Sequence, residues 1–377
     1  MLLNIKTNPD IIVIGGGLAG LTNAIDLRLR GYEVMLIEKK EYPFHKVCGE
    51  YVSNEVKPYL QRLGAFPVAL QPKTINRFEI SSLSGKVASC SMKMGGFAIS
   101  RYAFDNFLFE RASELGVRFM LNTTVNDVFF ENDEFTVTLM NGETFIARVV
   151  IGAFGKRSVL DKKLGREFFN RKTDYVGAKH HFKADFPEDL VALHNFEGGY
   201  CGLSRVENNH VNLCYLTTTK VFKQYGSIQD VEEKHLSQNP HLNKFFENAE
   251  SVFEPLVISQ VNFMTKKSVE NHVLMSGDAA GLIHPLCGNG MAMAIHSAKI
   301  CSGVVDAFLQ KRVSRKEMEY RYEQEWGHAF NFRLNFGKAV QGMFGKPVLS
   351  NLGVNVLRKF PGLLNKAVQL SHGKEVT

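Results

Sequence analysis

Two glycine-rich segments at opposite ends of the chain constrain its fold most strongly. The first, G-G-G-L-A-G at 15–20, follows the apolar run D-I-I-V-I and precedes a helical pattern that ends near Gly31. The second, G-D-A-A-G from Gly277, follows the apolar run V-L-M and precedes a helix of small residues. Both have the strand–loop–helix context of a loop that binds phosphate groups, so we expect them to meet in one domain.

Each glycine of the first loop has a mechanical role. Gly15 permits the tight turn, Gly17 lets the backbone approach a diphosphate, and Gly20 allows the helix to pack closely on the strand. The following helix N-terminus offers free N–H groups and the positive end of its dipole. Glu38 ends the next apolar strand, E-V-M-L-I-E, where a carboxylate can accept both ribose hydroxyls. The pattern predicts an adenine-dinucleotide site, and the carboxylate disfavours NADP there.

Composition limits the class of protein. The chain has 377 residues, of which 45% are hydrophobic and 22% are charged, which suits two joined globular domains. The six cysteines form no C-x-x-C pair and the first residues lack a signal-peptide pattern. We therefore expect a cytoplasmic protein without a metal site. The net charge of +7 indicates a basic surface or attraction to an anionic partner. Since no basic stripe is interleaved with aromatic residues, nucleic acid is not expected.

The order of patterns predicts a discontinuous domain. Strand patterns at 117–121, 125–130, 134–140 and 144–151 follow a helix at 101–115, and further β patterns fill 74–99 and 175–217. After Gly290 the chain is helical. We assign 1–72, 100–172 and 268–310 to the nucleotide-binding domain, 73–99 and 173–267 to a β-sheet substrate domain, and 311–377 to a helical region.

The segment P-F-H-K-V-C-G-E-Y-V-S, at 43–53, is similar to the C-G-E-x-x-S segment of geranylgeranyl reductases. These belong to the fold family typified by para-hydroxybenzoate hydroxylase. Four further segments match in order: the opening glycine loop, S-R-Y-A-F-D-N-F-L around Arg101, I-G-A-F-G-K-R-S at 151–158, and G-D-A-A-G with P-x-C-G-N-G-M. The resemblance implies a mixed α/β fold, with a Rossmann-like FAD-binding domain, an inserted antiparallel-sheet substrate domain and C-terminal helices.

The resemblance also implies which residues bind the nucleotide part of FAD. Ala19 and neighbouring loop amides meet the diphosphate, and Arg101 neutralises it. Glu38 binds the adenosine ribose, and the backbone of Val125 pairs with the adenine edge. Asp278, in the loop that starts at Gly277, binds the ribityl or diphosphate region.

A second set lies near the flavin ring in the resemblance. Cys48 and Gly49 lie along the cofactor, and Pro285 forms a wall over one flavin face. The helix that starts near Gly288 directs the amides of Gly290 and Met291 at the pyrimidine edge. A helix N-terminus there stabilises the negative charge of reduced flavin.

Four polar residues are candidates for chemistry. Cys48 is either a proton-donating thiol or a small wall residue. Glu50 is either an acid in the pocket or a cap for the helix that starts near Ser53. His284 either donates a proton to the substrate or is satisfied by the backbone. Tyr200, which begins a strand pattern of the inserted sheet, is expected to line the substrate pocket.

Departures from the family pattern leave the reaction open. Phe154 replaces the acid of the G-A-D-G segment, so the electron donor is either NAD(P)H or a partner reductase. We expect an FAD-dependent oxidoreductase that reduces a C=C bond of an apolar or carrier-bound, isoprenoid-like or polyene-like substrate. The alternatives are hydroxylation with O2 and, in another class, a non-enzymatic carrier of lipidated partners. The phenylalanine-rich C-terminal helices allow core packing or peripheral membrane contact.

Overall fold

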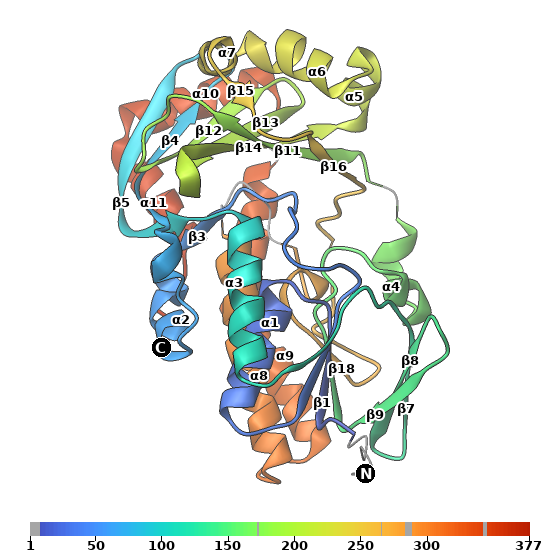
Figure 1. The fold of residues 1–377 in the computed structure, drawn as a ribbon. Coiled ribbons are helices and arrows are strands. Elements are labelled where there is room, and N and C mark those ends of the chain that lie inside the picture. Colours follow the sequence, from blue (N-terminus) through green and yellow to red (C-terminus); the bar gives the residue numbers. More distant parts are fainter. Residues whose placement is uncertain (1–7, 172, 265, 283–288, 342–344) are drawn as a thin grey trace.

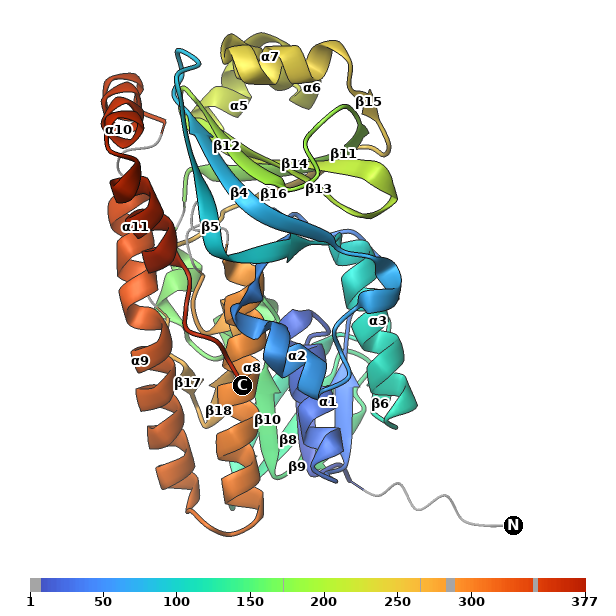
Figure 2. The ribbon, with the colours of Figure 1, turned by 90° about the vertical axis from the view of Figure 1, so that its left-hand side faces the viewer.

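The computed structural model describes residues 8–171, 173–264, 266–282, 289–341 and 345–377. Two units lie one above the other in Figure 1, each built around its own sheet. The C-terminal helices run along the outside of both units, as Figure 2 shows. The expected mixed α/β fold is confirmed.

The first unit is built on a six-stranded sheet with the order β17-β18-β10-β1-β2-β6. The central strands are fully buried runs of mainly Ile and Val, as parallel strands covered on both faces require. Only one described pair in this sheet, β17–β18, is antiparallel. The bounds are β1 (Ile11–Ile14), β2 (Val34–Ile37), β6 (Arg118–Met120), β10 (Val149–Gly152), β17 (Val269–Glu270) and β18 (Val273–Met275). β1 and β18, which precede the two glycine loops, are therefore separated by a single strand.

Long helices pack around this sheet. Both α1 (Leu18–Leu29) and α9 (Arg315–Gln341) contact α8 (Gly290–Leu309), and α1 also contacts α3 (Arg101–Glu114). Within the described residues, α8 alone is long and apolar enough to cross a membrane, and 78% of its apolar window is buried inside the protein. Such burial is typical of a core helix.

A small three-stranded sheet corrects one prediction. The expected strand at 144–151 is two strands, β9 (Thr144–Ala147) and β10, which belong to different sheets. The chain changes sheets at Arg148, where the N–H groups of Arg148 and Val149 both donate to Asp10 O. β9 pairs with β8 (Glu134–Leu139), which pairs with β7 (Val125–Glu131). The sequence did not indicate this break, because the apolar pattern continues from β9 into β10.

The second unit is a nine-stranded sheet. It is antiparallel except for the parallel pair β4–β12. Residues 51–53, which the sequence placed in the first unit, form β3 and pair with the end of β5. The bounds are β3 (Tyr51–Ser53), β4 (Lys73–Ser81), β5 (Val87–Ala98), β11 (Tyr175–Lys183), β12 (Leu190–Phe196), β13 (Gly199–Arg205), β14 (His210–Thr218), β15 (Glu250–Ser251) and β16 (Leu256–Ser259).

Helices cover the large sheet in two places. The short helices α5 (Thr219–Tyr225), α6 (Ile228–Asp230) and α7 (Pro240–Glu247), which the sequence analysis did not predict, follow β14, and α5 and α7 share an apolar cluster with it. The C-terminal helices α10 (Pro347–Lys359) and α11 (Pro361–Ser371) pack on β5. They contribute Val354 and Leu364 to a separate cluster with Tyr200. Two further short helices are α2 (Lys57–Arg62) and α4 (Val159–Lys163).

Candidate functional site

The first glycine loop has the geometry that its sequence predicts. Gly15 has φ of +106°, and a Cβ added there would lie 2.4 Å from Ala153 O. A Cβ on Gly20 would lie 1.9 Å from Gly15 O. Gly17 differs, because its added Cβ would meet only the cationic tips of Arg101 and Lys46, each at 3.6 Å. The loop therefore presents its Gly17 side to a pair of positive charges.

The N-terminus of α1 is suited to an anion. Gly17 is its N-cap residue, and no side chain of the described residues caps it. Its first-turn residues, L-A-G-L, are uncharged, so the positive end of the helix dipole is not neutralised within the turn. Ala19 lies in this turn, as the predicted diphosphate contact requires. The loop can therefore offer backbone N–H groups to phosphate oxygens.

The cations beside Gly17 are held by one buried carboxylate. Asp105 accepts two hydrogen bonds from Arg101, both at 2.7 Å, and one from Lys46 Nζ at 2.9 Å. Burial opposes ionisation of Asp105, but the charges of Arg101 and Lys46 outweigh it and lower its pKa. Burial also lowers the pKa of Lys46. Two cations against one carboxylate leave a net positive charge beside the loop, which suits a diphosphate.

Sequence reasoning found Arg101 in this cluster but missed Lys46 and Asp105. Lys46 stands inside the P-F-H-K-V-C-G-E segment. A positive charge within this motif was the sequence signal that could have identified Lys46 as a site residue. Asp105 lies four residues after Arg101 on α3, the spacing at which helix side chains meet.

Glu38 lies against the first loop, as predicted. Its Oε2 accepts a hydrogen bond from Gly16 N at 2.6 Å, and its Oε1 accepts one from Lys40 N at 3.1 Å. Each carboxylate oxygen can accept a second bond, so ribose hydroxyls can still be bound. Tyr42 donates to Gly16 O at 2.5 Å and closes the loop from the same side. Val125 begins β7, two residues after Thr123, whose N–H binds Glu38 O at 3.0 Å. Its contact with adenine stays a prediction.

The two glycine loops meet in space. Gly277 has φ of +65°, and its added Cβ would lie 2.9 Å from Ala19 Cβ on α1. Ser297 on α8 accepts the Gly277 N–H at 2.8 Å and holds the second loop on that helix. Asp278 and Gly290 lie around Gly277, in a narrow crevice between the loop and α8. The two loops therefore lie side by side as expected, and α8 starts beside them.

A buried lysine supports the Asp278 segment. Lys266 Nζ donates to Asp278 O at 2.8 Å and to Lys156 O at 2.9 Å. Burial lowers the pKa of Lys266 to about 8, because a charged ammonium is costly to remove from water. The sequence analysis did not single out Lys266, which stands in a K-K pair that suggested an exposed surface.

Hydrogen bonds to other segments hold the N-terminus of α8 in place. Its N-cap residue Asn289 donates from Nδ2 to Glu55 at 3.1 Å and to Ser371 O at 2.9 Å, and no described side chain caps the helix. Arg333 pairs with Glu55 at 2.8 Å. Gly290 and Met291 therefore start a helix whose N-cap residue is held by Glu55 and Ser371, and among the described residues no side chain binds its first N–H groups. His284, Pro285 and Gly288 lie outside the described residues.

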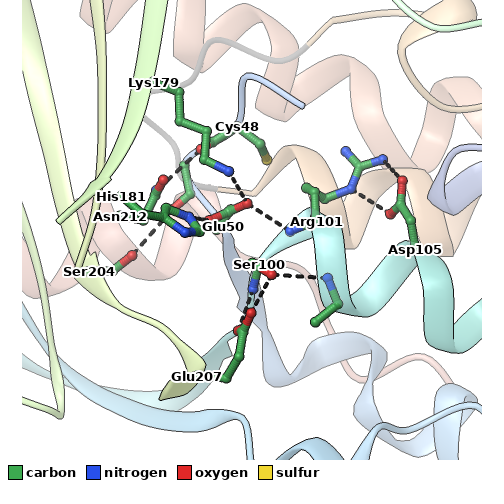
Figure 3. Close-up of polar contacts among 12 residues, drawn as sticks. Cys48, Glu50, Ser100, Arg101, Asp105, Lys179, His181, Ser204, Glu207 and Asn212 are labelled. Carbon is green, nitrogen blue, oxygen red and sulfur yellow. Dashed lines mark hydrogen bonds and ion pairs between the residues drawn. The ribbon is translucent and has the colours of Figure 1, made fainter. Parts of the chain in front are cut away.

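The segment 48–50 is tethered to the large sheet (Figure 3). Cys48 O accepts from Asn212 Nδ2 at 3.2 Å, and Gly49 O accepts from Ser204 Oγ at 3.4 Å. A Cβ on Gly49 would meet nothing within 4 Å, so space is open beside it. The Cys48 thiol contacts the Arg101 guanidinium. Cys48 and Gly49 thus lie between the cationic cluster and the second unit.

Glu50 is the buried centre of this junction. Its carboxylate accepts from Lys179 Nζ at 2.5 Å, from His181 Nε2 at 2.6 Å and from Arg101 N at 2.7 Å, as Figure 3 shows. Burial opposes ionisation, but Lys179 and His181 hold the pKa of Glu50 below its usual value.

These contacts correct one of the two sequence interpretations of Glu50. The helical turn near Ser53 is capped by Ser53 itself, whose Oγ accepts from Glu55 N, whereas Glu50 binds the first N–H of α3. A role for Glu50 as an acid in the pocket stays a prediction, and the three donors around its carboxylate suit a positioning role. Its partners Lys179 and His181 were missed, because they lie in a strand pattern that resembled ordinary sheet.

Tyr200, which the sequence predicts to line a substrate pocket, is buried in an apolar cluster. It is the second residue of β13. Its side chain is 5% exposed, and the cluster also includes Leu193, Leu216 and Val261. Leu282, which follows the second glycine loop closely, belongs to the same cluster. The contact with substrate stays a prediction.

This arrangement fits FAD. The N-terminus of α1, with the excess positive charge at Gly17, matches the diphosphate. The N-terminus of α8 matches the flavin edge, and the carboxylate of Glu38 matches the ribose. A site for NAD, which has no flavin, would need the first glycine loop alone.

Comparisons with known proteins agree with this geometry. Residues 8–310 match the family model described as FAD binding domain. The chain is 24% identical over 366 residues to conditioned medium factor receptor 1 of Dictyostelium discoideum, covering 86% of this chain and 69% of that protein. It is 27% identical to digeranylgeranylglycerophospholipid reductase 1 of Methanothermobacter thermautotrophicus, with 80% and 78% covered. It is 22% identical to menaquinone reductase of Mycobacterium tuberculosis, with 81% and 78% covered.

A solved structure shares the fold. The flavoprotein/dehydrogenase from Cytophaga hutchinsonii superimposes with a TM-score of 0.78 at 18% sequence identity, covering 96% of this chain and 95% of that chain. The predicted resemblance to geranylgeranyl reductases is confirmed, and so is the FAD cofactor. The chain belongs to the FAD binding domain family and is an FAD-dependent oxidoreductase.

Proposed function

We propose that the protein reduces a C=C bond of an apolar, isoprenoid-like or polyene-like substrate, either free or bound to a carrier. One observation carries the substrate class. Leu282, which follows the cofactor loop, packs in the same apolar cluster as Tyr200 and Leu216 of the large sheet. An apolar chain held in this cluster would therefore end beside the cofactor loop. The names of the digeranylgeranylglycerophospholipid and menaquinone reductases support this class of substrate.

The chain contributes positioning and electrostatics. Reduced FAD supplies the hydride when bound. The N-terminus of α8, with Gly290 and Met291, stabilises negative charge at the flavin edge. Asn212 and Ser204 hold the backbone of Cys48 and Gly49 against the large sheet, and Glu50 binds Lys179 and His181 beside them. Cys48 Sγ, Glu50 and His284 are the proposed sources of a proton. A substrate of this class resides in a bilayer, so the proposal includes peripheral contact with a membrane.

The electron donor is part of the proposal. Phe154, in place of the family's acid, is partly buried against the core of the first unit, and its ring would lie 2.9 Å from a Cβ added on Gly152. It therefore fills space behind the first loop with an apolar ring. We propose reduction by a separate electron-donor protein, with direct reduction by NAD(P)H as the competing route. A cytoplasmic location is also proposed.

Anaerobic turnover tests the reaction. FAD-loaded protein reduced with dithionite, which bypasses the unknown donor, is mixed with a digeranylgeranyl phospholipid or a menaquinone. Mass spectrometry is expected to show product that has gained hydrogen at a C=C bond without oxygen. Product that appears only after O2 is admitted, and that has gained oxygen, would contradict the reductase proposal and identify a hydroxylase.

A control separates the pocket from the fold. Tyr200→Ala removes an apolar side chain from the cluster and is expected to raise KM for the lipid more than tenfold, since burial of an apolar side chain against a ligand is worth about 1.5–3 kcal/mol. Phe129→Ala removes an exposed ring of the first unit and should leave KM unchanged. FAD content is measured for both variants.

A further inference from the structure

The outer face of α10 carries an apolar stripe that the fold does not cover. Val348, Leu352, Val356 and Phe360 are spaced four residues apart, so they lie along one side of the helix. Val348 is 78% exposed, and Leu352 and Phe360 are each 60% exposed. Leu363, in the first turn of α11, continues the stripe and is 50% exposed. Scattered exposed apolar residues are ordinary, whereas a continuous stripe marks an interaction surface.

The opposite side of α10 accounts for its attachment to the protein. Val354 is buried in the cluster that contains Tyr200, and Ser350 is also buried. The outer stripe is therefore not needed to hold the helix in place. Figure 2 shows α10 and α11 on the outside of the molecule beside β5.

The charge around the stripe has one sign. Residues 345–371 include Lys346, Arg358, Lys359 and Lys366 but neither Asp nor Glu, although the whole chain has 38 acidic residues. All four cations are exposed. A helix with an exposed apolar face and flanking Lys and Arg is the pattern of a segment that lies in the surface of an anionic membrane.

The position of the stripe relates it to the substrate cluster. Through Val354 and Leu364, the helices α10 and α11 separate the exposed stripe from Tyr200 and Leu282. The segment before α10 is anchored by Gly198 N, which donates to Gly345 O at 2.9 Å. A bilayer that touched the stripe would therefore lie one helix layer away from the cluster proposed to take the apolar substrate.

We propose that the stripe, defined as Val348, Leu352, Val356, Phe360 and Leu363, docks on the surface of a membrane that contains anionic phospholipid. The proposal rests on the proposed function only for the nature of the substrate drawn from that membrane. A second copy of the chain is a poorer occupant, because a symmetric contact would bring the same cations against each other.

Vesicle flotation tests the docking without any turnover. FAD-loaded protein is mixed with vesicles of phosphatidylcholine alone, or with a third of phosphatidylglycerol, at low and high salt. Binding is expected to be at least about tenfold tighter to the anionic vesicles and to weaken at high salt, because exposed charges are screened. Leu352→Glu with Phe360→Glu is expected to reduce that binding at least tenfold.

Matched variants and a second readout decide the outcome. Val68→Glu with Phe129→Glu changes two other exposed apolar residues, which are 70% and 59% exposed, and should bind like the wild type. Wild-type protein that stays unbound on anionic vesicles, or a stripe variant that binds as well as wild type, would overturn the docking proposal. Sedimentation that shows the stripe substitutions converting a dimer to a monomer, without vesicle binding by either form, would also overturn it.

Turnover is measured separately on detergent-solubilised lipid. There the stripe variant is expected to act like the wild type, because no membrane has to be reached. Vesicle binding without reduction of any lipid would leave the docking in place and reject the proposed reaction, so the two failures are distinguishable.

Discussion

Gly17→Glu is expected to abolish FAD binding while the protein still folds. Gly17 has φ of −87°, which any residue adopts, and a Cβ there meets only Arg101 Nη2 and Lys46 Nζ, both at 3.6 Å. The new carboxylate would pair with these cations and occupy the space of the phosphates. Loss of two charge-assisted hydrogen bonds, at roughly 1.5 kcal/mol each, predicts about a 100-fold or larger loss of FAD affinity.

Titration of apoprotein with FAD, followed by flavin fluorescence, measures this effect. Gly303→Glu is the matched control, because it places the same side chain in open space on α8, where an added Cβ meets nothing within 4 Å. It should bind FAD like the wild type. If the Gly17 variant keeps its circular dichroism spectrum and binds FAD with unchanged affinity, the diphosphate does not lie beside Arg101 and Lys46.

Lys179→Met is expected to cost about 3–5 kcal/mol of unfolding free energy, the range measured when one partner of a buried ion pair is removed. Lys179 and Glu50 are both fully buried, and their charged atoms are 2.5 Å apart. Without Lys179, desolvation of the Glu50 carboxylate is offset less, so its pKa should rise. Urea unfolding followed by circular dichroism, with and without FAD, gives the free energy.

Two further variants separate charge from packing. Glu50→Gln combined with Lys179→Met removes both charges, so the double variant should be more stable than Lys179→Met alone. Lys183→Met breaks an exposed pair with Glu250 and should change the free energy by less than about 1 kcal/mol. Equal losses for the Lys179 and Lys183 variants would show that the buried pair does not stabilise the protein more than an exposed pair does.

The parts of the site that depend on local pattern could be predicted from the sequence. The first loop, its flanking strand and helix, and Glu38 are joined by fewer than thirty residues, and the glycine spacing expresses the turn directly. The second loop could be assigned because it repeats the same context. Their contact through Ala19 and Gly277 then follows from the positions of β1 and β18, which are separated by one strand in the same sheet.

The parts that depend on long-range pairing could not be predicted. Lys179 lies in the run Y-V-G-A-K-H-H-F, where an alternating pattern would leave a lysine in water, but both faces of β11 are covered at that point. Its partner Glu50 is 129 residues away in sequence. Nothing local distinguishes such a lysine from a surface lysine. The break at Arg148 was hidden for a related reason, because the change of sheet is set by Asp10 O rather than by the apolar pattern.

For the apolar stripe on α10, the sequence could not predict which residues face the protein and which face solvent. From the sequence, the phenylalanines of the C-terminal helices suggested either core packing or membrane contact, and α10 and α11 carry both a buried apolar side and an exposed apolar side. Val354 and Leu364 face the protein, whereas Leu352 and Phe360 face solvent. Only the position of α10 against β5 assigns each side.

Identification of the flavin released from purified protein is the sharpest test of the FAD site. The protein is denatured, the released chromophore is separated by chromatography against FAD and FMN standards, and its amount is compared with that of the chain. We expect FAD, in a ratio near one per chain after reconstitution, because Gly17, Glu38 and the Gly277 loop together match the whole dinucleotide. A chain that takes up FMN in preference to FAD, or neither of them, would contradict this expectation.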